Sequence, residues 1–243
     1  MSFLDMTDEI RTAVDRWDGS FGAPAQENKT TEAVQVFASK FLERVFATSH
    51  PFLPVVWFGP FIVYGLVVPF TSAGVGVTRG LALYALGVLA WTFVEYMLHR
   101  FVFHLKPGES YGSKMRIFMM HGYHHQFPND RMRLVAPPIM SWPVALVFIL
   151  MYRAIFGADL WWTIFGGTSL GYLAYDWIHY YTHHFRPTTA LGKFLRRNHM
   201  IHHFNNPEAN HGISSPLWDY ALGTFQGQAT GRPARDEREE RTA

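Results

Sequence analysis

The histidines of this chain are its most conspicuous chemical feature, because 13 are present and most fall into four short groups. Two of these groups are His121-Gly-Tyr-His-His125 and His199-Met-Ile-His-His203. Residues three and four apart share one face of a helix, so the histidines within each group converge. Imidazole is the commonest metal ligand among side chains, and it suits zinc, copper, iron and nickel. The spacing therefore predicts metal binding.

The number of grouped histidines indicates two metal ions rather than one. The other two groups pair His99 with His104, and His179 with His183-His184. Ten or more ligands are too many for a single ion, whereas two ions with about five ligands each account for them. The alternative is a proton-relay cluster without metal, in which packed imidazoles repel one another once they are protonated. A dinuclear metal site is the interpretation that we favour.

Two carboxylates accompany the histidines. Glu95 lies four residues before His99, and Asp176 lies three residues before His179. A ligating histidine usually donates its second N–H to a carboxylate or a carbonyl, so each acid is a candidate partner behind the ligands. Asp176-x-x-His179 also fits half of a carboxylate-bridged bundle site, but such sites need paired motifs and further glutamates. The histidine-rich site is therefore favoured.

The histidine groups must be positioned by the helices that form from long runs without Asp, Glu, Lys or Arg. A membrane helix needs about 20 largely apolar residues, and the runs predict four such helices near 52–70, 81–102, 138–155 and 160–181. The last contains Gly167-Thr-Ser-Leu-Gly171, a small-residue face suited to close helix packing. The predicted fold is all-α: an integral-membrane four-helix bundle of two hairpins under a histidine-rich helical cap. The alternative is a buried bundle in a soluble protein.

Lys and Arg set the expected orientation, because they favour the cytosolic side. They gather between 99 and 133 and after 184, whereas the two tight connections hold one each. Both termini and the histidine groups are therefore expected on the cytosolic face. The expected organisation is a cytosolic N-terminal segment at 1–44, a membrane domain with the dimetal site at 45–228, and a charged tail at 229–243.

Composition excludes several classes of protein. The chain has 243 residues and no cysteine, which excludes disulfide frameworks, thiolate zinc sites, iron–sulfur clusters and cysteine nucleophiles. Its 49% hydrophobic and 16% charged residues exclude a disordered chain. The net charge of +2 does not indicate a nucleic-acid partner. Arg100, Lys106, Arg131 and Arg133 are candidates to meet an anionic lipid head group, with topology alone as an equal explanation.

Several motifs together resemble the fatty acid hydroxylase superfamily, and within it the fatty acid 2-hydroxylases that act on sphingolipid acyl chains. The resemblance runs from about 91 to 224. The motifs that carry it are Glu95-Tyr-Met-Leu-His-Arg-Phe-Val-Phe-His104, His121-Gly-Tyr-His-His125, Pro128-Asn-Asp, Arg133-Leu-Val-Ala-Pro-Pro138, Tyr175-Asp-Trp-Ile-His-Tyr-Tyr-Thr-His183, His199-Met-Ile-His-His-Phe204 and Ser215-Pro-Leu-Trp-Asp219.

The resemblance implies a membrane enzyme that uses O2 and two external electrons to hydroxylate C2 of a fatty acyl chain, free or in a sphingolipid-type lipid. It implies iron for catalysis, because zinc has no redox chemistry, although zinc is expected to occupy the site in purified protein. Ten positions match the ligands of the two metal ions: His99, His104, His121, His124, His125, His179, His183, His199, His202 and His203.

Two departures from the family pattern carry expectations of their own. No cytochrome b5 domain with a His-Pro-Gly-Gly motif precedes Val45, so we expect a separate electron donor of the cytochrome b5 or ferredoxin type, and a bacterial inner membrane rather than the endoplasmic reticulum. A position that is commonly aromatic in the family is His211 here, in a polar turn that we expect at the site entrance. His50, His184 and His211 are expected outside the ligand set.

Three alternative functions stay open at this point. Another oxygenase or desaturase of the superfamily, acting on a sterol or a carotenoid, has the same histidine groups. A metal transporter places its ligands near the bilayer midplane at broken helices, whereas these histidines lie at predicted helix ends. A non-catalytic metal protein binds zinc without O2-dependent turnover.

Overall fold

The computed structural model describes residues 5–22, 34–72 and 74–228, and this part of the chain is helical with no strand. One isolated antiparallel bridge joins Met6 and Phe37. The predicted all-α class is confirmed for these residues. The helices are α1 (Asp8–Arg16), α2 (Lys40–Leu42), α3 (Leu53–Thr71), α4 (Val77–Leu98), α5 (Tyr111–Ile117), α6 (Tyr123–Gln126), α7 (Pro138–His184), α8 (Ala190–Phe204) and α9 (Leu217–Ala221), with π-helical turns η2 (Glu43–Ala47), η3 (His99–Phe103) and η4 (Phe118–Gly122).

Helix α7 is folded back on itself at Gly157. This glycine has a φ of +75°, which interrupts the helix in a conformation that residues with a Cβ rarely adopt. Across the break, the hydroxyl of Tyr152 in the first half lies 3.0 Å from the hydroxyl of Thr168 in the second half. In a straight helix, sixteen residues would separate these positions by about 24 Å. The halves 138–156 and 158–184 therefore form a hairpin, close to the two helices predicted for this region.

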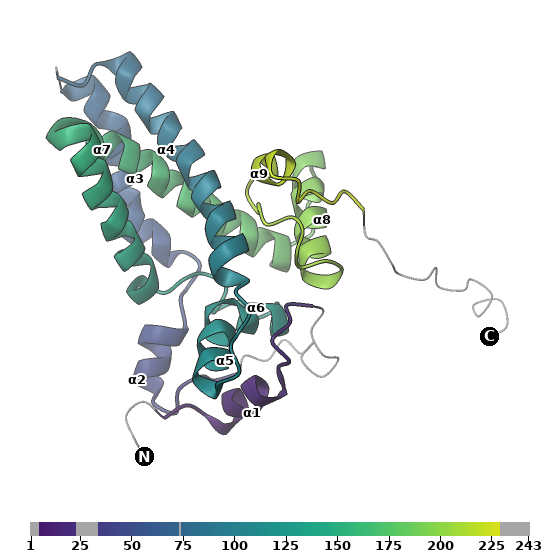
Figure 1. The fold of residues 1–243 in the computed structure, drawn as a ribbon. Coiled ribbons are helices and arrows are strands. Elements are labelled where there is room, and N and C mark those ends of the chain that lie inside the picture. The colour runs from purple at the N-terminus through teal and green to yellow at the C-terminus, as the bar shows by residue number, and fades with distance from the viewer. Residues whose placement is uncertain (1–4, 23–33, 73, 229–243) are drawn as a thin grey trace.

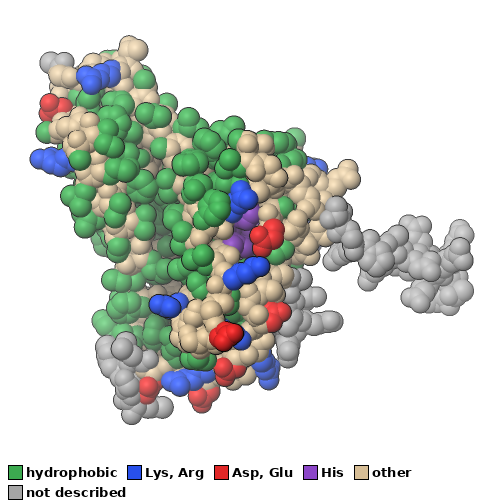
Figure 2. All heavy atoms as spheres, in the orientation of Figure 1, with side chains coloured by type: hydrophobic (Ala, Val, Ile, Leu, Met, Phe, Trp, Pro, Cys, Tyr) green, Lys and Arg blue, Asp and Glu red, His purple; other side chains and the backbone are tan. Residues whose placement is uncertain are grey.

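Three helices are long and apolar enough to cross a membrane: Leu53–Thr71, Val77–Phe103 and the folded Pro138–His184. The four predicted helices correspond to α3, α4 and the two halves of α7. Many of their large side chains face outward, as Val63, Phe70, Val147 and Ile155 do. Figure 2 shows this hydrophobic surface over the upper part of the molecule, while charged side chains gather mainly at the lower end. Such a surface suits contact with lipid.

Close backbone approach joins α4 to the second half of α7. A Cβ on Gly167 would lie 1.9 Å from the Tyr84 carbonyl oxygen, and a Cβ on Gly171 would lie 2.6 Å from the Cβ of Trp91. The predicted small-residue packing face is thus confirmed. Because α4 leads into His99 and α7 carries His179, this contact also fixes the spacing between two histidine groups.

The N-terminal segment shares a core with α5, η4 and α6, the histidine-bearing cap of the apolar helices. Ile10 and Val14 of α1 are buried with Trp17 against Phe118 and Tyr123. Figure 1 shows α1, α2, α5 and α6 gathered at one end of the apolar helices, with α8 and α9 beside them. This core contains residues from both sides of position 44, and the division of the chain at that position stays a prediction. The predicted tail at 229–243 lies outside them.

Candidate metal centre

The ten histidines proposed as ligands come together in two groups of five. Within each group, one ligand atom per residue lies within 4.8 Å of all the others. His183 is half-buried, and the other nine are buried. The first cluster is His99, His104, His121, His125 and His202, and the second cluster is His124, His179, His183, His199 and His203.

Two π-helical turns place histidines that regular helices would separate. The His104 N–H donates to the His99 carbonyl at 3.2 Å, a bond across five residues that closes the turn η3. The rings of His99 and His104 are thereby held 5.0 Å apart. The turn η4 ends at Gly122 and sets His121 into the same cluster. Such wide turns are often found at functional sites.

Each three-histidine group divides between the two clusters. Residues four apart share a face, so His121 and His125 enter the first cluster, whereas His124 enters the second. The clusters adjoin where the rings of His125 and His203 stack, with centroids 4.2 Å apart. Spacing predicted that the histidines converge, and the structure adds how they are divided.

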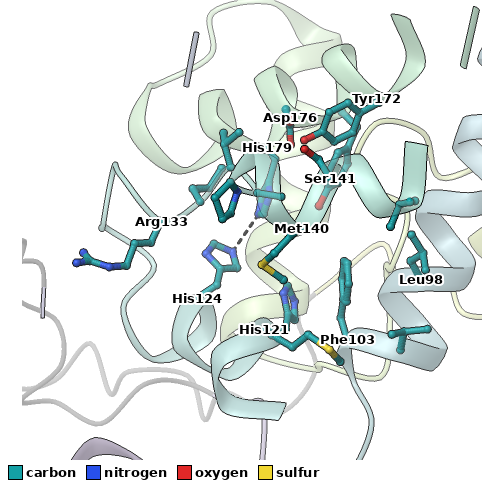
Figure 3. Close-up of a pocket in the computed structure, with 18 of the residues that line it drawn as sticks. Leu98, Phe103, His121, His124, Arg133, Met140, Ser141, Tyr172, Asp176 and His179 are labelled. Atoms are coloured by element: carbon teal, nitrogen blue, oxygen red, sulfur yellow. Dashed lines mark hydrogen bonds between the residues drawn. The ribbon is translucent and has the colours of Figure 1, made fainter. Parts of the chain in front are cut away.

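The distances between ring nitrogens fit metal ligation. Nε2 of His124 lies 3.0 Å from Nε2 of both His179 and His203, and the first of these contacts is drawn in Figure 3. In the first cluster, the Nε2 atoms of His99 and His121 are 3.1 Å apart. Two nitrogens at right angles around an ion, each about 2.1 Å from it, are about 3.0 Å apart. The donor set therefore fits a pair of transition-metal ions.

Backbone carbonyls fix the tautomers of two candidate ligands. His99 donates through Nδ1 to the His211 carbonyl at 2.6 Å, and His202 donates through Nδ1 to the Ala209 carbonyl at 2.8 Å. A carbonyl oxygen only accepts, so in both rings the lone pair stays on Nε2. Nε2 of His202 is buried with no hydrogen-bond partner in the described chain. This is the arrangement that metal-ligating histidines usually have.

Burial keeps the cap histidines neutral at physiological pH. Removal from water is the largest cause of their lowered pKa values, and the neighbouring imidazoles are the next. Burial lowers the pKa of His124 and of His211 to about 3. The pKa is likewise below its usual range at His104, His121, His125, His199, His202 and His203.

These shifts predict that the metal-free protein is sensitive to acid. Below about pH 6.5 the unfolded chain binds protons that the folded chain does not, so the free energy of unfolding falls as the pH falls. We expect the midpoint of thermal unfolding to be flat above pH 7 and to fall steeply from pH 6.5 to pH 4. A midpoint independent of pH over this range would contradict the prediction.

Glu95 acts on the first cluster through a loop rather than by direct contact with a histidine. It is buried and accepts hydrogen bonds from the Ile213 N–H at 2.6 Å, the Ser214 N–H at 2.8 Å and the Ser214 hydroxyl. The same loop presents the His211 carbonyl to which His99 donates. The carboxylate thus holds the acceptor that orients a ligand, one step further away than the sequence predicts.

The Glu95→Ala variant should therefore lose metal from the first cluster. Removal of the carboxylate leaves three donors of the loop unpaired, and a loss behind a metal ligand typically costs about 10–100-fold in affinity. Metal titration of the variant should show one weakened ion and one unchanged ion. The matched control is Glu109→Ala, an exposed glutamate near the cap. Equal weakening of both ions would contradict the path through the loop.

Asp176 lies at the cavity wall rather than against a histidine nitrogen. It is buried, and its Oδ2 has no hydrogen-bond partner in the described chain. Figure 3 shows Asp176 beside Tyr172 and Ser141, with His179 one turn further along α7. Asp176 is therefore placed to meet whatever occupies the cavity.

The three other histidines differ from one another. His50 is exposed and stacks on Phe52, and His184 is half-buried against Tyr180. His211, in contrast, is only 1% exposed and lies beside the first cluster, so the expectation of an entrance position for it is wrong. One feature of the sequence could have indicated this buried position: His211 stands where the matched family motif commonly has an aromatic residue.

A cavity of about 740 Å³ connects the apolar helices with both clusters. His121 of the first cluster and His124 and His179 of the second line one part of it. Most of the rest is apolar, with Phe58 and Phe165 among the lining residues. Of the basic residues considered for lipid head groups, Arg133 pairs with Glu43 and Asp130, and Arg100 donates to the Tyr96 hydroxyl at 2.6 Å.

Comparison with known proteins shows which proteins have similar sequences. The model of the fatty acid hydroxylase family matches residues 84–224, a segment that contains all ten clustered histidines. A dihydroceramide fatty acyl 2-hydroxylase of Arabidopsis thaliana is 37% identical over 196 residues, which cover 81% of each chain. A fatty acid 2-hydroxylase of Homo sapiens is 36% identical over 214 residues, which cover 80% of this chain and 57% of the human protein.

A solved structure, described as full-length scs7p with only the hydroxylase domain visible, has the same fold. Its TM-score is 0.71 at 24% identity, and the match covers 96% of this chain and 94% of the other. The relatives come from a plant, mammals and yeasts, so they give no support to the expectation of a bacterial inner membrane. The extent of the family match and the identity to the plant and human enzymes show that this chain belongs to the fatty acid hydroxylase family.

Proposed function

We propose that this protein is a membrane dimetal oxygenase that hydroxylates C2 of a fatty acyl chain, free or in a sphingolipid-type lipid, with O2 and two electrons from a separate donor. The observation that carries the proposal is the cavity, because one apolar space extends among the membrane helices and also contacts histidines of both clusters. The plant and human relatives, named as 2-hydroxylases, support the position of attack.

The cavity walls orient the acyl chain. Phe58, Trp91 and Phe165 line the part among the apolar helices. A methylene chain bound there would be shielded from water by these side chains. At the histidine end, the Asp176 carboxylate and the Ser141 hydroxyl line the same space. These polar groups accept hydrogen bonds from the polar end of the lipid or donate hydrogen bonds to it. The carbon next to the carbonyl then lies beside His124 and His179.

The ten clustered histidines would hold the two ions, which when bound supply the redox chemistry that attack on an unactivated C–H bond requires. Iron meets this requirement and zinc does not. The protein contributes neutral imidazoles with fixed tautomers, as at His99 and His202. It also contributes a buried, apolar surrounding that keeps solvent from the reacting carbon.

Lipid mass spectrometry is the direct test of this function. Cells that express the protein should accumulate 2-hydroxy acyl lipids, and cells that express the double variant His124→Ala/His202→Ala should not. Cells with the His50→Ala variant serve as the matched control and should resemble the wild type. Hydroxylated sterols or carotenoids in place of 2-hydroxy acyl species would contradict the substrate assignment.

A separate electron donor is a further expected requirement. The sequence contains no cysteine for an iron–sulfur cluster and no His-Pro-Gly-Gly haem-binding motif. We expect the purified, iron-loaded protein to give no product with O2 and NADPH alone. Addition of reduced cytochrome b5 or ferredoxin should start turnover, measured as 2-hydroxy product per chain. Full activity of the pure protein with NADPH alone would contradict the prediction.

A further inference from the structure

The part of the cavity among the apolar helices is bordered by exposed side chains at one end and by buried side chains at the other. The two halves of α7 are antiparallel, so Met140 and Val144 of the first half lie toward the histidine end, and both are exposed. The opposite end is lined by Phe165, Thr168 and Ser169, and all three are buried. A hydrocarbon chain that enters from the exposed side therefore meets a closed end.

Direct contacts between helix backbones close this end. A Cβ on Gly65 of α3 would lie 2.9 Å from the Cα of Gly166, and a Cβ on Gly87 of α4 would lie 2.2 Å from the Ile164 carbonyl oxygen. Helices that approach one another this closely leave no space for a hydrocarbon chain between them. The contact between the two halves of α7 described above closes the remaining side. The cavity thus ends where α3, α4 and both halves of α7 meet.

The distance from the histidines to this closed end sets the length of chain that fits. Phe165 and His179 both line the cavity and lie fourteen residues apart on one helix, which places them about 21 Å apart along its axis. An extended hydrocarbon chain advances about 1.25 Å per carbon, given single bonds of about 1.5 Å and near-tetrahedral angles. With C2 beside His179, the space therefore takes a chain of about 16 to 18 carbons.

We propose that Phe165 and Ser169 limit the acyl chain of the substrate to about 18 carbons. The ring of Phe165 is fixed by the helix core, with its centroid 5.2 Å from that of Phe61. Ser169 lies one turn nearer to the histidines, and its hydroxyl has no hydrogen-bond partner in the described chain, so its small size is what leaves room for the chain. A longer chain reaches the closed end before its C2 reaches the histidines.

This inference rests on the proposed function, because it takes the occupant of the cavity to be an acyl chain with C2 at the histidines. Binding by the purified protein without an electron donor tests it apart from catalysis. The probes are saturated fatty acids of about 14 to 24 carbons, offered together in detergent, which bracket the length given by the helix rise. Mass spectrometry of the retained acids should show at least about 10-fold less retention at 24 carbons than at 18, since even one misfitted methylene group in an apolar pocket costs this much.

Two substitutions at the closed end should move this limit in opposite directions. Phe165→Ala removes the ring and should raise the limit by about two to four carbons, whereas Ser169→Leu adds bulk and should lower it by about the same. A general loss of stability does not produce shifts of opposite sign. The matched control is Phe70→Ala, because Phe70 is exposed on α3 outside the cavity lining, and it should keep the wild-type profile.

The wild type and Ser169→Leu decide the proposal if Phe165→Ala does not fold. Retention of acids of about 24 carbons equal to that of acids of about 18 carbons, no retention of any acid, or a wild-type profile in a folded Ser169→Leu would overturn the limit. The production of 2-hydroxy lipids in cells would then still support the proposed function. A limit found in binding, with no 2-hydroxy lipid in cells, would instead overturn the proposed function and leave the limit in place.

Discussion

Alanine in place of His202 or His203 is expected to remove one metal ion per chain and to lower hydroxylation by at least about 100-fold. The two residues are adjacent on α8, yet His202 enters the first cluster and His203 the second. Each substitution removes a nitrogen donor from a buried site. Even a loss behind a ligand costs about 10–100-fold in affinity or activity, so the loss of a ligand should cost more.

The two substitutions also distinguish the two sites experimentally, because each removes a donor from a different cluster. Metal analysis of each variant should find about one ion, and the double variant should hold none. His50→Ala and His184→Ala are the controls and should keep about two, because neither residue belongs to a cluster. Two ions retained in both His202→Ala and His203→Ala would mean that the clusters are not the ligand sets.

The spacing of the histidines made the donor set accessible from the sequence. Residues at i, i+3 and i+4 must lie close on a helix whatever the rest of the fold does, and charge-free runs predict apolar helices in the same direct way. The prediction near 52–70 corresponds to α3 at Leu53–Thr71. The break near Gly157 was also foreseeable, because the two predicted helices end and begin on either side of it.

The supporting contacts were not accessible in this way, because they join segments far apart in the chain. Glu95 meets Ile213 and Ser214, and His99 meets the carbonyl of His211. No periodicity records such pairings, and the loop that carries them has no regular structure. The position of Phe21 against His104 is likewise fixed by the core of the cap, which forms only when the N-terminal segment packs against α5 and η4.

Gly167→Ala is expected to destabilise the protein by about 3 kcal/mol or more, because overpacking at this site involves backbone rather than a flexible side chain. The added Cβ would lie 1.9 Å from the Tyr84 carbonyl oxygen and 2.8 Å from its carbonyl carbon. Since neither atom can rotate away, α4 and the second half of α7 must separate. That movement also separates His99, which follows α4, from His179 on α7.

The Gly167→Ala variant should therefore lose metal as well as stability, although it changes no residue of either cluster. The measurements are the temperature of aggregation in detergent and the metal content of the fraction that stays monodisperse. Gly112→Ala is the matched control, because a Cβ there meets nothing within 4 Å and alanine favours the helix α5. A fully metallated Gly167→Ala protein of wild-type stability would show that the two helices do not set the distance between the histidines that they carry.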